Sequence, residues 1–299
     1  SLYRGLNATA DNSALFIQGM LGMANDPAAT KAALGVNFRA WLAGGDDALG
    51  KFILDFDRES LQTGRLTSSE WTKFRLHIGG GDTEMMIGAP GTYMERIARA
   101  PFVRQANRAF GYFGDTLRLK WADNLLETEL KRGRSIREIQ TSGDLRRIAD
   151  VANSMTGWSS EKSLSSMADA LLFAPRFLQS RLNTTAKAAM SLRPGATLDQ
   201  RIARRSMLQM IGIGIGMTYM LNAMQGRDTD FSPMRQRRDG GWYYNSNFLR
   251  VRFGERDYSL LGPWDSLARA MAKTVYDPSA GRPAPDQALR GMGSGLLKV

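Results

Sequence analysis

Residues Ser206–Met224 read SMLQMIGIGIGMTYMLNAM, and no other stretch of the sequence runs as long without a charged side chain. A basic run, Arg201–Arg205, precedes it. At about 1.5 Å per residue, a helix of this length approaches the roughly 30 Å thickness of a bilayer's hydrocarbon core. Whether this helix lies in a membrane, in a protein core or between subunits therefore decides most of what the chain can do.

Three glycines, at 212, 214 and 216, alternate with isoleucine inside this stretch. The spacing Gly-x-Gly-x-Gly and the apolar flanks do not match a dinucleotide-binding loop, so we expect no cofactor. Small residues instead suit close packing of one helix on another, and the amides Gln209 and Asn222 are costly when they face lipid. Membrane span, buried core helix and contact between subunits all stay open. The residues expected to serve membrane contact or helix packing are Met207, Ile211, Gly212, Gly214, Gly216 and Tyr219.

The N-terminal part, residues 1–78, is expected to form a helical bundle. Apolar residues at helical spacing predict one helix up to Asn25, a second over 28–43 and a third from Asp46 to Leu61. Thr67 and Glu70 form a capping-box pattern before a further helix. Residues 79–91 are a glycine-rich connection, which lacks the Gly-Lys-Ser/Thr ending of a phosphate-binding loop.

Residues 92–200 are expected to form a long helical region. Pro101 breaks its first helix, Ser135–Thr156 predicts a basic pair of helices, and the helix over 161–192 is interrupted near Pro175. The acidic residues of the first helix lie at helical spacing beside basic ones, which predicts solvated charge pairs and no acid/base pair. They are Asp115, Asp123, Glu127 and Glu129.

Residues 201–276 carry the apolar helix, a β-hairpin and a last helix over 266–276. Alternation over 248–253 and the turn Gly254–Asp257 predict that hairpin, the one place where strand character is expected. The tail 277–299 is rich in glycine and proline and is expected to be extended or disordered. The fold class expected is mainly α: a multi-helix bundle with a small β-hairpin near the C-terminus.

The net charge of +11 favours an anionic partner, either DNA or an anionic lipid surface. Aromatic residues from Trp242 to Phe248 interleave with arginines, as in surfaces that stack on bases. The same residues also describe an amphipathic hairpin that covers the bundle, and we favour this structural interpretation. The candidate contacts to DNA or an anionic surface are Arg204, Arg205, Arg235, Arg237, Arg238, Arg250 and Arg252.

Catalytic chemistry has few candidates in this sequence. There is no cysteine, which excludes a thiolate nucleophile, and the one histidine, His77, is expected at the surface or in a cap. Asp228 and Asp230 supply half a cation site at most. We expect no enzyme, no catalytic residue and no metal site. The alternative is a peptidoglycan hydrolase or a nuclease, and the hydrolase would rest on Glu70 or Glu84.

Several blocks, in this order, resemble the large polyvalent protein-associated regions near the C-termini of giant tailed-phage virion proteins. The blocks are Asn7–Ala14, Gln18–Met20, Ile148–Gly157, Leu171–Leu182, the apolar helix, Asp228–Phe231 and the hairpin Arg250–Leu261 running into Gly262–Asp265. The resemblance covers about residues 5–275, and it does not extend to Gly79–Gly91 or to Arg235–Arg238.

The resemblance implies an internal virion or ejection protein, without catalytic residues that transfer to this sequence. Its expected partners are other copies of itself and the portal and tail proteins of the virion, with DNA and the host membrane as further partners. Its expected place is the virion, and after ejection the host cell envelope. The alternative is a scaffold module that stays in the particle. Because the chain starts at Ser1, we also expect a processed product or a piece of a longer polypeptide.

Overall fold

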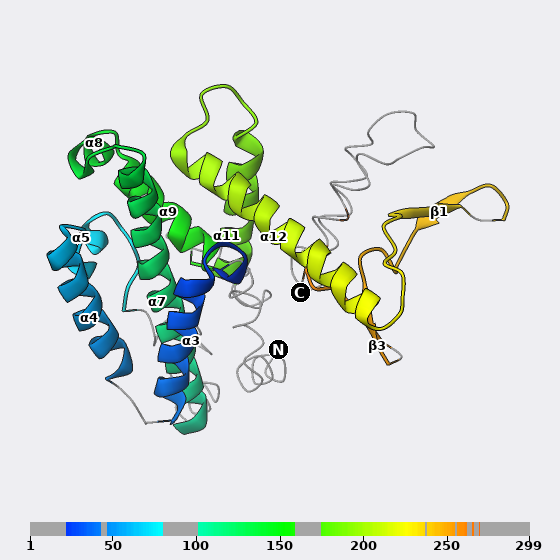
Figure 1. Cartoon of the computed structure of the whole chain (residues 1–299), viewed down its shortest axis with the longest axis horizontal. Coiled ribbons are helices and arrows are strands. Elements are labelled where there is room, and N and C mark those ends of the chain that lie inside the picture. Colours follow the sequence, from blue (N-terminus) through cyan, green and yellow to red (C-terminus); the bar gives the residue numbers. More distant parts are fainter. Residues whose placement is uncertain are drawn as a thin grey trace. The chain divides into compact units, whose positions relative to one another are not determined.

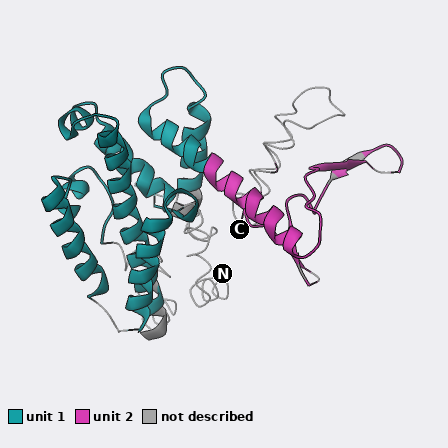
Figure 2. Ribbon diagram, viewed as in Figure 1, with its two compact units in different colours: residues 1–207 teal, residues 208–299 magenta. Residues whose placement is uncertain are grey.

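The computed structural model describes residues 22–42, 47–79, 101–158, 175–236, 238–254, 256–261, 265 and 269 (Figure 1). The chain divides into two compact units, residues 1–207 and 208–299 (Figure 2). The described part is mainly helical with short antiparallel strands toward the C-terminus, which confirms the predicted fold class. The predicted last helix, the tail, the first helix up to residue 21 and residues 80–91 lie outside the described residues.

Most predicted helices of the first unit are confirmed, with boundaries shifted by a few residues. Proline starts three of them, as its fixed φ suits a first helical position. The helices are α3 (Pro27–Leu42), α4 (Ala48–Thr63), α5 (Ser68–Lys73), α7 (Pro101–Lys131), α8 (Ile136–Thr141), α9 (Asp144–Met155) and α11 (Pro175–Met190); α12 (Leu198–Met224) begins in this unit and ends in the second.

Helix α7 is the centre of the first unit, and α3, α4 and α9 all pack against it (Figure 1). Small residues of α3, Ala29 and Ala33, let Phe113 and Leu117 of α7 approach closely. A larger apolar cluster joins α7 to the segments on its other sides; it includes Phe56, Trp71, Leu126, Ile139 and Ile148. Burial of these side chains supplies the main driving force for folding of this unit.

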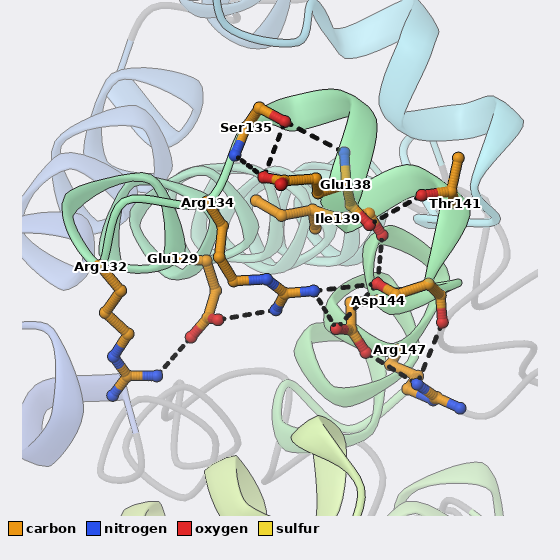
Figure 3. A network of polar contacts seen from close by, with 10 residues as sticks. Glu129, Arg132, Arg134, Ser135, Glu138, Ile139, Thr141, Asp144 and Arg147 are labelled. Atoms are coloured by element: carbon orange, nitrogen blue, oxygen red, sulfur yellow. Dashed lines mark hydrogen bonds and ion pairs between the residues drawn. The ribbon is translucent and has the colours of Figure 1, made fainter.

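Two capping boxes fix the starts of short helices. Thr67 and Glu70 form the predicted one: the Thr67 backbone N–H donates to Glu70 Oε2 at 2.8 Å. Ser135 and Glu138 form a second at the start of α8, with the Ser135 N–H donating at 2.7 Å (Figure 3). Each box satisfies backbone donors that the first helical turn leaves open, which explains why helices of six residues persist here.

The prediction that the carboxylates of α7 are solvated is wrong for three of them. Asp115 and Asp123 are each 1% exposed and Glu129 is 5% exposed. Only Glu127 follows the prediction, since it pairs with the exposed Lys131 four residues on, at 2.8 Å. The physical reason is the central place of α7, which leaves it no broad solvent-facing side, so its charges have to be matched inside the protein.

Arginines are the positively charged partners of the buried carboxylates of α7. Arg118, fully buried on α7 itself, contacts Asp115 at 2.7 Å and donates from Nε to Thr156 Oγ1 at 2.8 Å. Arg65 reaches Asp123 at 2.9 Å from the turn after α4, where Gly64 adopts a positive φ of 66°. The Arg118–Thr156 hydrogen bond and the Arg65–Asp123 pair tie α7 to other segments, so these contacts also fix how the segments meet.

Arg134 plays the same part at the C-terminal end of α7. It contacts Glu129 at 2.9 Å and Asp144, at the start of α9, at 2.7 Å (Figure 3). Arg147 contacts the second oxygen of Asp144 at 2.8 Å. The turn that joins α7 to α9 is thereby held by charge on both sides of α8.

His77 lies half-buried, not at the surface or in a cap as predicted. Its ring stacks on Trp158 with centroids 3.6 Å apart and planes 9° apart. Its backbone N–H donates to Asn153 Oδ1 at 3.0 Å, and its carbonyl accepts from Arg118 at 3.2 Å. The chain after α5 is thus bound along α7 and α9 by polar contacts at successive residues.

The second unit holds two pairs of antiparallel strands. The predicted hairpin is confirmed as β3 (Val251–Phe253) paired with β4 (Arg256–Tyr258), with Arg252 opposite Asp257. A further pair, β1 (Met234–Gln236) and β2 (Trp242–Tyr244), forms where the sequence analysis expected no strand, with Arg235 opposite Tyr243. Strands of three residues are too short for alternation to reveal them.

The burial of Asp123 predicts a pH dependence of stability. Burial outweighs the nearby Arg65 and raises the pKa of Asp123 to about 6, against 3.8 for an ordinary aspartate. Because the Asp123 carboxyl binds its proton more tightly in the folded protein than in the unfolded chain, the protonated group stabilises the fold below pH 4. This contribution is lost as the pH rises through 6. We expect the free energy of unfolding of wild type, relative to Asp123→Asn, to fall by roughly 2–3 kcal/mol between pH 4 and pH 7.5.

Urea unfolding at a series of pH values measures this difference. Glu127→Gln is the matched control, because Lys131 lowers the pKa of Glu127 and the same comparison should change with the opposite sign. A wild-type minus Asp123→Asn difference that stays constant across this range would contradict the assignment.

Candidate functional site

Helix α12 begins eight residues before the apolar stretch and ends with it at Met224. The Thr197 N–H donates to Gln200 Oε1 at 3.1 Å at the start. At the end, Gly226 takes a φ of 66° and the Arg227 N–H donates to the Asn222 carbonyl at 2.9 Å. Propensity and capping therefore define one continuous helix of 27 residues.

By length and composition, α12 is the one described helix that could cross a membrane, a property that core helices of soluble proteins share. Only 28% of its most apolar window is buried within the protein. A fully buried core helix therefore does not describe it, and the surroundings of its two sides in the second unit decide what it can do.

One side of α12 packs within the second unit along Gly214, Thr218 and Asn222, which repeat every four residues. Thr218 Oγ1 donates to the Gly214 carbonyl at 2.7 Å, which satisfies the hydroxyl inside the helix. Asn222 Nδ2 donates to the Arg250 carbonyl at 2.9 Å and contacts Thr229 Oγ1 at 3.0 Å. Thr218 and Asn222 thus face protein, as the cost of polar groups in lipid requires, whereas Gln209 is half-buried.

Gly214 is the point of closest approach on this side. A Cβ added there would lie 2.5 Å from Cδ2 of Leu261, which is 1% exposed. Leu261 forms a small core with Phe248 and Leu249, against which Ile215 packs. The absence of a side chain at position 214 is therefore what lets the segment after β4 sit on the helix.

Asp230 organises the loop that follows α12. It accepts hydrogen bonds from Asn245 Nδ2 at 2.7 Å and from the Ser232 N–H at 3.0 Å, and it pairs with Arg235. Burial raises the pKa of Asp230, but the hydrogen bonds from Asn245 and Ser232 and the charge of Arg235 outweigh it and leave the pKa below its usual value. This carboxylate is used in holding the loop, and Asp228 beside it is exposed.

The opposite side of α12 is exposed and apolar from Leu208 to Met224. Two glycines and an alanine at helical spacing, Gly212, Gly216 and Ala223, run along its middle, and larger side chains flank them. We call this surface the open face. Its members are Leu208, Gly212, Ile213, Gly216, Met217, Tyr219, Met220, Ala223 and Met224.

The open face contains no charged residue, and its large side chains are 45–76% exposed. Tyr219 lies near Phe231, itself 53% exposed, with ring centroids 6.5 Å apart. Continuous apolar surface of this kind on a soluble protein marks a site that meets a protein or a membrane.

The residues predicted for membrane contact or packing divide among three surroundings. Gly212, Gly216 and Tyr219 lie on the open face, whereas Gly214 lies beneath Leu261. Met207 is 6% exposed in the first unit, and Ile211 is half-buried.

Of the six large residues of the open face, Tyr219 alone was predicted from the sequence. Ile213, Met217, Met220 and Met224 repeat at intervals of four, three and four residues, which places them on one side of a helix. This spacing is the signal in the sequence that could have identified them.

The arginines predicted to contact DNA or an anionic surface have different surroundings. Arg205, Arg238 and Arg252 are exposed, and Arg204 is exposed while donating to the Ser191 carbonyl at 3.4 Å. Arg235 pairs with Asp230, and Arg250 is half-buried against Asp265 at 2.9 Å. Arg237 lies outside the described residues. At least two of these arginines therefore hold the second unit together.

The glutamate considered for hydrolysis is already engaged. The backbone and hydroxyl of Thr67 donate to Glu70, and these hydrogen bonds lower the pKa of its carboxyl. A general acid needs a raised pKa, so Glu70 is poorly suited to that role. Glu84 lies outside the described residues, and among those that are described no group of three or more possible ligands could hold a metal ion.

Comparison with protein-family models, with curated proteins and with solved structures finds no match to this chain.

Alanine substitutions at the three glycines of α12 should change the free energy of unfolding in opposite directions. Gly212→Ala and Gly216→Ala meet no atom within 4 Å, so the higher helix propensity of alanine should raise the free energy of unfolding by up to about 1 kcal/mol each. Gly214→Ala should instead lower it by roughly 1–2 kcal/mol, because the new methyl group overpacks against Leu261.

Chemical unfolding of the three variants side by side measures this contrast. Gly214→Ala combined with Leu261→Ala removes the overlapping atoms and should recover part of the loss. Equal effects at 212, 214 and 216 would show that Leu261 does not sit on the helix as described.

Proposed function

We propose that this chain is a structural virion protein of a tailed bacteriophage, which works as a multimer by assembling with other virion proteins and not by catalysis. The observation that carries the proposal is the open face of α12, an uncharged apolar surface that needs a partner. In this proposal the multimer lies next to the portal and tail, enters the host with the genome and assists its passage across the envelope.

Two further observations support this proposal. The sequence blocks described above resemble regions of giant phage virion proteins. In addition, the buried carboxylates of α7 are each matched by an arginine that joins two segments, and the Glu70 carboxyl is held in a cap. Charged side chains that stabilise the packing of segments are typical of a structural protein.

Mass spectrometry of purified phage particles tests the proposal. We expect the chain in intact particles and its loss, relative to the capsid protein, from particles that have released their genome. Retention after release would support the scaffold alternative in place of ejection. Absence from intact particles would refute a virion role altogether.

Membrane contact is a second candidate function, and the length and composition of α12 favour it. Exposed Arg204 and Arg205 precede the apolar stretch and exposed Arg227 follows it, which suits anionic headgroups at the ends of the helix.

Flotation of the purified protein with vesicles of phosphatidylcholine and phosphatidylglycerol tests this second function. We expect binding that Met220→Glu, on the open face, reduces at least about tenfold, since a carboxylate is costly in hydrocarbon. Leu61→Glu is the matched control, because Leu61 is 72% exposed on α4, away from α12 in the sequence. A protein that stays unbound to these vesicles would rule the membrane function out.

A further inference from the structure

The open face of α12 has a size that suits a protein partner. Because a large side chain offers roughly 150–250 Å², its six large residues at 45–76% exposure present on the order of 700 Å² of apolar surface. A stable protein–protein interface buries about 800 Å² on each partner. One helix of this chain therefore carries close to the whole area that one side of an interface requires.

No contact within the described part of the chain requires glycine at the two glycine positions of the open face. Gly214 is required by Leu261, but a Cβ at Gly212 or Gly216 would meet nothing within 4 Å. Glycine inside a helix destabilises it relative to alanine, and it offers lipid less apolar surface than any other residue. Two exposed glycines one turn apart are instead what a second helix needs in order to approach closely.

The distribution of charge on the chain favours a second copy as the partner of the open face. The chain carries a net charge of +11, so two copies repel each other over most of their surface. From Ser206 to Met224 there is no charged side chain, which makes the open face a place where two copies can meet without opposing cations. A second copy also supplies the same apolar area and the same glycines, as a two-fold interface demands.

We propose that the open face pairs with the open face of a second copy, with the two α12 helices antiparallel and crossing at Gly216. This arrangement sets the long Met220 side chain of one copy over Gly212 of the other, so that large meets small. It also keeps the two Arg204–Arg205 pairs roughly 30 Å apart, whereas a parallel pair would place them side by side. The inference rests on the proposed function, since it names the contact from which the multimer is built.

Cysteine cross-linking tests this pairing, and the natural sequence contains no cysteine to interfere. Under mild oxidation, Gly216→Cys should give a disulfide-linked dimer. A mixture of Gly212→Cys and Met220→Cys proteins should give the mixed dimer in preference to either homodimer, because disulfides form only between Cα atoms within about 7 Å. Leu192→Cys, exposed on the turn after α11, is the control and should stay monomeric.

A second variant tests the contact without oxidation. Gly216→Leu should weaken self-association in sedimentation equilibrium at least about tenfold, since a bulky side chain at the crossing holds the helices apart. Gly35→Leu is the matched control, because Gly35 is a helical glycine of α3 that also has no atom within 4 Å of an added Cβ. Circular dichroism before each run establishes that both variants are folded.

Homodimers linked at each of Gly212→Cys, Gly216→Cys and Met220→Cys would show parallel helices and overturn the proposal. A Gly216→Cys protein that forms no disulfide would overturn it as well. Vesicle binding that is unchanged by Gly216→Leu, in a protein that never cross-links, would assign the open face to lipid and overturn it too. These results are independent of particle composition. A chain found in virions but lacking the cross-link refutes the pairing alone, and a cross-linked chain absent from virions refutes the virion role alone.

Discussion

The first unit depends on one electrostatic constraint: its central helix carries charges that have no access to water. An ionised carboxylate in the interior of a protein costs several kcal/mol unless a partner compensates it. Asp115, Asp123 and Glu129 of α7 each have such a partner within 2.9 Å or less, and it is an arginine every time. The arginines come from α7 itself, from the turn after α4 and from the turn before α8.

This arrangement makes the packing specific as well as stable. Apolar side chains alone would allow α4 or α8 to slide along α7 at modest cost, since hydrophobic burial has no preferred direction. A guanidinium that has to reach a buried carboxylate fixes the register of the segment that bears it. Gly64 ends α4 with a positive φ just before Arg65, and the Arg65 guanidinium reaches Asp123.

The sequence was sufficient for much of the fold and for the location of the candidate site. Proline and apolar spacing predicted α3 and α4, and the Thr67–Glu70 pattern predicted the cap of α5, because these features depend on local chemistry. The burial of Asp115 and Asp123 could not be predicted in this way. Acidic and basic residues at helical spacing look the same on a solvated helix and on one enclosed by neighbours. The different surroundings of the three glycines could not be predicted either, since only the position of Leu261 distinguishes Gly214 from Gly212 and Gly216.

The chemistry of the flanking side chains gives the open face one more property. Three of its six large residues are methionines, Met217, Met220 and Met224, and all three are 46–76% exposed. Oxidation of a thioether to the sulfoxide replaces a flexible apolar group with a polar one. The surface that gives α12 its capacity to bind is thus also a surface that peroxide can make polar.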